Sequence, residues 1–140
     1  MFSTILVASD GSDSADRLVA VARSLARDGR SKVVVAHVNK MMAVRGGCYP
    51  VYPHEDMLQM KVRHQVADLQ AAGVEAELQT KSTFGETAPA LAEVAHECRA
   101  DLIVTGEGRR RRLPRIAFRS IGQRMPRLAS CPVLVIPPQN

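Results

Sequence analysis

The segment STILVASDGS, Ser3 to Ser12, decides the fold that the sequence predicts. Its start, Ser3 to Ser9, is a short apolar run rich in β-branched residues, which is typical of a buried strand. The turn that follows leads into Ser12 to Asp28, where apolar side chains recur on one broad helical face and Gly29 provides a C-terminal stop. A buried strand that passes through a tight turn into an amphipathic helix indicates an α/β domain.

The same alternation of strand and helix continues to the end of the chain. Val74 to Thr80 alternates apolar and polar residues, so we expect a half-exposed strand near a sheet edge. Further strands are predicted at Lys32 to Val38, Asp101 to Thr105 and Pro132 to Ile136. Further helices are predicted at Glu55 to Ala72, Thr87 to Cys98 and Pro114 to Ala129, the last with a kink or an early end at Pro126. Asn39 to His54, which is rich in Gly and Pro, is predicted to be an irregular loop. The fold class is therefore α/β, with five strands in a doubly wound, mostly parallel sheet and helices on both faces.

Length and composition fit one globular domain that spans residues 1–140. Of the 140 residues, 46% are hydrophobic and 24% are charged, which is enough for one buried core. No apolar run approaches the roughly 20 residues of a membrane span and no signal-peptide pattern is visible, so we expect a cytoplasmic protein without a membrane partner. Cys48, Cys98 and Cys131 are odd in number and widely spaced, which favours reduced thiols over a disulfide framework or a metal site.

Positive charge is concentrated in the last quarter of the chain. Up to Glu107 there are 11 Lys and Arg residues against 14 Asp and Glu, whereas the remainder holds 8 Arg and no acidic residue. Such a cluster is a candidate surface for an anionic partner, either nucleic acid or an acidic protein, and a solvated basic loop is the alternative. Its members are Arg109, Arg110, Arg111, Arg112 and Arg115. The chain has no Trp and only three Phe and two Tyr, so it offers few platforms on which nucleic acid bases could stack.

Two predicted loops carry residues suited to binding a ligand. Ser9-Asp10-Gly11-Ser12 follows the first strand, and Thr105-Gly106-Glu107-Gly108 follows the fourth. In doubly wound sheets, ligands bind beyond the carboxyl ends of the strands, at the point where the strand order reverses. If the first and fourth strands are neighbours, Asp10 faces the glycine turn.

The motifs along the chain resemble those of a known family. ILVASDGS near the start, AHV at the end of the second strand, DLIVTGEG after the third helix and RSIGQRMPRLASCPVLVIP at the end are similar, in that order, to universal stress proteins. The resemblance covers essentially the whole chain. It implies a five-stranded parallel sheet of order 3-2-1-4-5 and a homodimer in which the last strands meet.

The resemblance also implies where a nucleotide would bind. Members of the family that bind ATP carry Gly-x2-Gly-x9-Gly-Ser after the fourth strand. On this sequence the first glycine is Gly106 and the serine is Ser120, but Arg109 and Arg119 stand where the other two glycines belong. The family contacts that the sequence retains are Asp10 at the ribose, Val38 at the adenine and Ser120 at the phosphates.

The two arginines allow two interpretations. Glycine lets phosphate oxygens reach backbone N–H groups, whereas arginine adds bulk and removes conformational freedom. Arg119, turned inward, could also pair with Asp10 and fill the cleft. We therefore favour the loss of family-typical ATP binding. In the alternative, guanidinium groups at Arg109 and Arg119 contact the phosphates, Gly108 takes over from the missing glycine, and an ATP or AMP-type nucleotide binds, with Mg²⁺ only if the ligand is ATP.

The sequence shows no catalytic constellation. It lacks a nucleophile-base-orienter set, a GKS or GKT phosphate loop and paired carboxylates. His37 ends a predicted buried strand and is more typical of a satisfied core histidine, and Asp10 has a simpler role as a turn or N-cap residue. The resemblance implies a regulatory or binding protein of the stress response, with slow ATP hydrolysis at most.

The final strand is the candidate dimer interface. An exposed apolar edge strand pairs with another chain unless it is covered, and the flanking prolines limit the length of such a ladder. The residues of this strand are Val133, Leu134, Val135 and Ile136. Replacing Leu134 with lysine is predicted to yield monomers.

Overall fold

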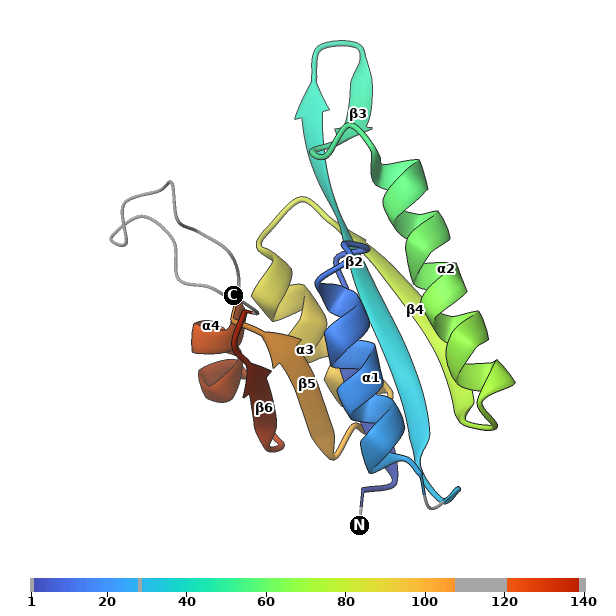
Figure 1. Ribbon diagram of the computed structural model, residues 1–140. Coiled ribbons are helices and arrows are strands. Elements are labelled where there is room, and N and C mark those ends of the chain that lie inside the picture. The colour runs from blue at the N-terminus through green and yellow to red at the C-terminus, as the bar shows by residue number, and fades with distance from the viewer. Residues whose placement is uncertain (1, 28, 108–120, 139–140) are drawn as a thin grey trace.

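The computed structural model describes residues 2–27, 29–107 and 121–138, which form a twisted sheet with helices on both faces (Figure 1). The strands are β1 (Thr4–Ala8), β2 (Lys32–Val44), β3 (Gly47–Pro50), β4 (Glu75–Thr83), β5 (Leu102–Gly106) and β6 (Val133–Ile136). The helices are α1 (Ala15–Leu25), α2 (Glu55–Ala71), α3 (Thr87–Glu97) and α4 (Ile121–Leu128). The α/β class predicted from the sequence is confirmed.

The five parallel strands lie in the order β4-β2-β1-β5-β6. This corresponds to the expected order 3-2-1-4-5, and it places the first and fourth predicted strands side by side. The sheet has a sixth strand that the sequence analysis did not predict, because β3 pairs antiparallel with the far end of β2. β4 pairs with β2 alone among the described strands and has a largely exposed pattern, as expected for an edge.

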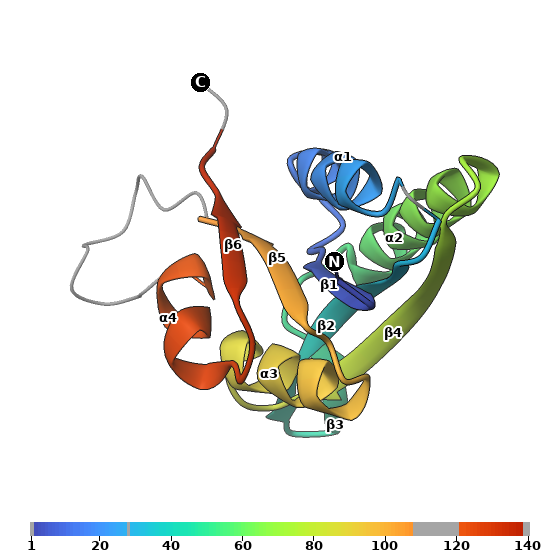
Figure 2. The same cartoon turned by 90° about the horizontal axis from the view of Figure 1, so that it is seen from below.

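Two apolar layers hold the helices on the sheet. Successive side chains of a strand point to opposite faces, so Ile5 and Val7 of β1 join one core cluster while Leu6 joins the other. The first cluster packs against α1 and α2, and the second packs against α3 and α4 (Figure 2). The central strands β1 and β5 are almost completely buried because both of their faces are covered.

The prediction of an irregular loop at Asn39 to His54 is wrong over most of its length. β2 continues to Val44, and Met41–Val44 pairs with Gly47–Pro50 as a hairpin at one end of the sheet (Figure 1). Arg45 and Gly46 form the two-residue connection, in which Gly46 has a φ of +98°. Glycine is favoured there because tight hairpin turns need positive φ, so the two glycines mark a turn between strands.

The predicted helices agree with the structure where it describes them. α1, α2 and α3 lie within the predicted ranges, and α4 begins at Ile121 in the described part of the chain. α4 runs through Pro126 and ends at Leu128, one residue before the predicted end, so the expected early end at Pro126 is wrong. None of the helices in the described ranges is long and apolar enough to cross a bilayer.

The ends of α2 and α3 share a backbone conformation but not a residue type. Gly73, the second residue after α2, has a φ of +84°, and Arg99, the second residue after α3, has a φ of +56°. At Arg99 the left-handed conformation lets the N–H of Ala100 donate to the carbonyl of Ala95 at 2.9 Å. α3 therefore ends with an arginine where a glycine would be less strained.

Candidate functional site

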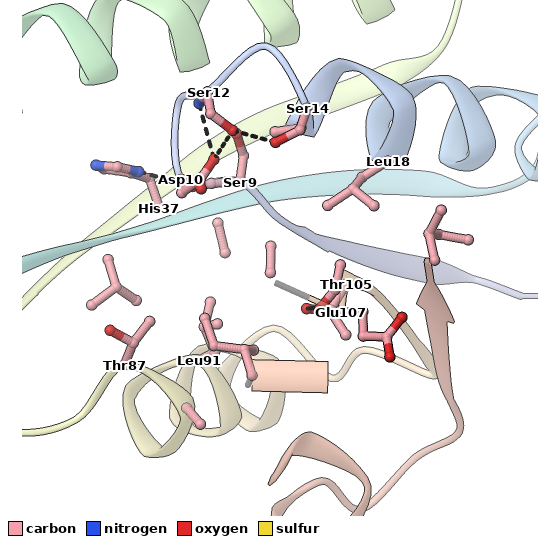
Figure 3. Close-up of a pocket in the computed structure, with 18 of the residues that line it drawn as sticks. Ser9, Asp10, Ser12, Ser14, Leu18, His37, Thr87, Leu91, Thr105 and Glu107 are labelled. Carbon is pink, nitrogen blue, oxygen red and sulfur yellow. Dashed lines mark hydrogen bonds between the residues drawn. The ribbon is translucent and has the colours of Figure 1, made fainter. Parts of the chain in front are cut away.

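A cavity of about 970 Å³ opens beyond the carboxyl ends of β1 and β5. β1 lies between β2 and β5. From β1 the chain adds β2 and β4 on one side of the sheet and then β5 and β6 on the other, so the cavity sits where the strand order reverses. The β1–α1 loop forms one wall and the first turns of α3 form another (Figure 3). Other residues of the cavity lining come from the ends of β2 and β5, from α4 and from the segment after β6.

The floor of this cleft is aliphatic. Small side chains from β1, β2 and α3 leave room above the sheet and present no hydrogen-bonding groups. They are Ala8, Ala36, Val38, Ala88 and Leu91. An apolar floor of this kind suits a flat, poorly hydrated part of a ligand, such as a nucleotide base.

The β1–α1 loop presents a polar wall to the cleft. Asp10 Oδ1 accepts hydrogen bonds from the Ser12 N–H at 2.9 Å and from the Ser12 hydroxyl, and the hydroxyls of Ser12 and Ser14 lie 2.8 Å apart (Figure 3). Asp10 thus serves as the turn residue that the simpler interpretation predicted, and it also lines the cavity. Its second carboxylate oxygen remains available to a ligand within the described surroundings.

Close packing against α2 fixes the position of this loop. Gly11 has a φ of +79°, and a Cβ built on it would lie 2.6 Å from the carbonyl oxygen of Leu58. Only glycine fits at this position, because it adopts a positive φ readily and has no Cβ to collide with the backbone of α2. The loop therefore touches α2 directly behind the polar wall.

A buried hydrogen-bond chain extends from the loop to α2. The Ser9 hydroxyl donates to Gln65 Oε1 at 2.6 Å, and Gln65 Nε2 donates to Asp16 Oδ1 at 3.0 Å. Lys61 Nζ lies 3.0 Å from Asp16 Oδ2. Partial burial acts to raise the pKa of Asp16, but the bonds from Gln65 and Lys61 outweigh it and hold that pKa below its usual value. Asp16 is consequently a carboxylate that anchors α1 to α2.

A buried histidine–glutamate pair joins β2 to the start of α2. His37 and Glu55 are only 3% and 4% exposed, and His37 Nε2 lies 2.8 Å from Glu55 Oε2. His37 Nδ1 lies 2.8 Å from the carbonyl oxygen of Ser9, which can only accept, so Nδ1 carries a proton. A hydrogen bond between His37 Nε2 and Glu55 Oε2 needs one further proton, which is held by either His37 or Glu55. His37 is thus a satisfied core residue as expected, and its partner Glu55 was not identified from the sequence.

The charged groups around the cleft are mostly acidic in the described residues. The acidic side chains are Asp10, Asp13, Asp16, Glu86 and Glu107, and the basic ones are Arg17, Lys40 and Arg124. Two of these cations are already engaged: Arg124 pairs with Glu86 at 2.6 Å, and Arg17 donates to the Pro137 carbonyl at 2.9 Å. The described walls therefore carry only a small excess of negative charge, because Lys61 also pairs with Asp13 and Asp16.

The structure brings three of the predicted site residues together. Asp10, Val38 and Gly106 line the same cavity although they come from the loop after β1, from β2 and from β5. The remaining predicted residues lie outside the described ranges: Gly108, Arg109, Arg119 and Ser120 of the nucleotide site, and Arg109 to Arg112 with Arg115 of the basic surface. Both predictions about these arginines therefore remain predictions.

Gly122 shapes the cleft from the side of α4. A Cβ at this position would lie 2.7 Å from Val135 Cγ1 and 2.9 Å from the carbonyl oxygen of Gly106. Close approach of α4 to β5 and β6 thus requires a glycine. In the described residues, no group of three or more His, Cys, Asp or Glu side chains is placed to hold a metal ion.

A doubly wound, mostly parallel sheet defines an α/β protein, and its cleft lies at the switch point, where folds of this class bind their ligands. The chain belongs to the universal stress protein family, whose model matches residues 1–137. Universal stress protein YxiE of Bacillus subtilis (strain 168) is 27% identical over 148 residues, which cover 97% of this chain and 99% of that protein.

Solved structures of the family have the same fold. A universal stress protein family member from Burkholderia pseudomallei has a TM-score of 0.69 and 30% identity, with 96% of both chains covered. The universal stress protein from Archaeoglobus fulgidus in complex with dAMP has a TM-score of 0.69 and 24% identity, with 96% of this chain and 97% of that chain covered.

Proposed function

We propose that this stress protein is a cytoplasmic regulatory module that binds a nucleoside monophosphate in the cleft. One observation carries the proposal: the cavity of about 970 Å³ at the switch point is lined by Asp10, Val38 and Gly106. These are the positions at which the family resemblance puts ribose, adenine and the start of the phosphate loop. The dAMP complex of the Archaeoglobus fulgidus protein shows that a fold of this kind can hold such a ligand.

The charge of the described walls favours a monophosphate over ATP. Five carboxylates and three cations line the cavity, and Lys61 pairs with two of the carboxylates, so the described walls carry a small excess of negative charge. A triphosphate adds about two negative charges to those of a monophosphate and is repelled more strongly. The proposal therefore adopts the AMP-type alternative of the sequence analysis, and it shares with the favoured interpretation only the loss of family-typical ATP binding.

Equilibrium dialysis of the purified protein with AMP and with Mg-ATP tests this function. We expect saturable, near-stoichiometric binding of AMP and weaker binding of ATP. Asp10→Ala removes the carboxylate next to the expected ribose and should weaken AMP binding by about 10- to 100-fold, since hydrogen bonds to charged groups contribute about 1.5–3 kcal/mol. Glu77→Ala, at a partly exposed carboxylate of β4 that does not line the cavity, is the control. Absence of AMP binding to the unmodified protein would refute the proposal.

A second variant tests the role of the arginines. If Arg119 fills the cleft, Arg119→Gly should strengthen nucleotide binding, whereas it should weaken binding if Arg119 contacts the phosphate. Neutralising Arg109 to Arg112 should leave AMP binding unchanged if these residues serve only a basic surface for an anionic partner.

We further propose that the protein is a homodimer joined through β6. β6 pairs with β5 on one side, and no other described strand covers its second edge. Leu134 on this strand is 38% exposed, an unusual position for a large apolar side chain in the middle of a strand. Sedimentation of Leu134→Lys should show monomers, and an unchanged mass would rule out this interface.

A further inference from the structure

Tyr52 occupies a distinctive place at the cleft. It lines the cavity whose floor includes Val38, and it is the only Phe, Tyr or Trp among the described lining residues. Its side chain is 52% exposed, and its hydroxyl has no hydrogen-bond partner within the described ranges. An exposed aromatic residue therefore lines the same cavity as the aliphatic floor, and no polar contact in the described ranges explains its position.

The backbone around Tyr52 is held on both sides. Before it, the Val51 N–H donates to the Lys40 carbonyl oxygen at 2.7 Å, which ties the segment to β2. After it, Glu55 at the start of α2 bonds His37 of the same strand at 2.8 Å. Tyr52 thus lies in a short connection between β3 and α2 that is fixed at two points to β2, the strand that carries Val38 (Figure 1).

This fixed segment is also stiff. Pro50 and Pro53 flank Val51 and Tyr52, and each proline restricts its own φ and the conformation of the residue before it. An aromatic side chain on such a segment loses little additional backbone entropy when a ligand arrives. It is preorganised as a binding surface.

Tyr49 provides a contrast within the same hairpin. It is also half exposed, at 48%, but it does not line the cavity, and its hydroxyl lies against the backbone of Gly47. Exposure alone therefore does not distinguish Tyr52. Tyr52 differs from Tyr49 because it is exposed and also lines the cavity.

We infer that Tyr52 is a stacking residue that holds the planar base of the bound nucleotide against the aliphatic floor at Val38, and so selects ligands that carry a base. This inference rests on the proposed function, because it names how the same cleft recognises one part of its ligand. Base–aromatic stacking tolerates different bases, so the contact selects for a base in general and most strongly for the larger purines.

The amino-acid composition offers a direct optical test. The chain has no Trp and two Tyr, so in a Tyr49→Phe variant Tyr52 is the sole source of tyrosine fluorescence. Titration of this variant with AMP should quench that emission with the same dissociation constant that dialysis gives. Ribose 5-phosphate, which lacks the base, should bind at least about 5-fold more weakly and should not quench.

Substitutions at Tyr52 give an independent measure. Tyr52→Phe keeps the ring and should bind AMP within about twofold of the unmodified protein, whereas Tyr52→Ala should bind about 5- to 150-fold more weakly. Tyr49→Ala is the matched control and should leave the AMP affinity unchanged. Circular dichroism melts of all three variants establish that each is folded.

The outcomes separate this inference from the proposed function. If the unmodified protein binds AMP but Tyr52→Ala binds it equally well, or if AMP binds without quenching Tyr52, the stacking role is wrong and nucleotide binding stands. If the unmodified protein binds neither AMP nor ribose 5-phosphate, the proposed function fails and the stacking role fails with it.

Discussion

Removing Glu55 should destabilise the protein strongly, because it leaves His37 without its partner in the core. Both side chains are at least 96% buried, and the shortest distance between them is 2.8 Å. Truncation of one member of a buried pair costs about 3–5 kcal/mol, whereas whole domains are stable by about 5–15 kcal/mol. Glu55→Ala should therefore lower the melting temperature by about 10–15 °C for a chain of this length.

Urea denaturation followed by circular dichroism measures this effect. Glu55→Gln should cost only about 1 kcal/mol, because the amide can still form a hydrogen bond with Nε2 of His37. Glu77→Ala is the matched control: Glu77 pairs with Lys32 at 3.1 Å, but both side chains are more than one third exposed, so the loss should stay below about 1 kcal/mol. If Glu55→Ala and Glu77→Ala cost the same, the buried pair does not secure α2 and the reasoning is wrong.

Three further substitutions test other parts of the fold. Gly122→Ala places a Cβ 2.9 Å from the Gly106 carbonyl oxygen and should cost about 1–3 kcal/mol in urea denaturation; a neutral effect would mean that α4 does not press on β5. Arg99→Gly relieves a φ of +56° and should raise the free energy of unfolding by about 0.5–1 kcal/mol after the entropy cost of glycine, seen as a higher urea midpoint; a lower midpoint would contradict the strain argument. Partial burial acts to raise the pKa of Asp101, but hydrogen bonds from the N–H groups of Ser3 and Thr4 outweigh it and hold the pKa below its usual value. The stabilisation that this carboxylate contributes is therefore complete above the unfolded-state pKa and is lost as the pH falls through the folded-state pKa. Asp101→Asn should therefore be less stable than the unmodified protein at about pH 7, with the difference shrinking toward about pH 3, and a difference independent of pH would count against this.

The positions of the parallel strands could be predicted because each is a local pattern. Ser3 to Ser9 and Lys32 to Val38 are apolar runs that only a sheet covered on both faces can bury, and β1 and the first half of β2 do so. The order of the strands came from the family resemblance and not from periodicity. The hairpin could not be predicted in this way, because Gly46 and Gly47 are as typical of irregular chain as of a turn between two strands.

Part of the site depends on contacts that no local pattern encodes. Asp10 could be identified because it follows a strand directly, in a loop whose chemistry is visible in the sequence. Glu55 could not, because only the docking of α2 on β2 brings its carboxylate to His37, 18 positions away in the chain. Tyr52 was equally hidden, since its place at the cleft follows from the path of the hairpin.

β2 carries the buried His37–Glu55 contact and the cleft residue Val38 at neighbouring positions. His37 and Val38 are joined by one peptide bond, and both residues line the cleft, while His37 also bonds Glu55 of α2. A ligand that orders Val38 also restrains the peptide unit of His37, and linkage requires the effect to be reciprocal. Ligand occupancy of the cleft should consequently slow amide exchange in the first turn of α2, where Glu55 bonds His37 and Leu58 also lines the cavity.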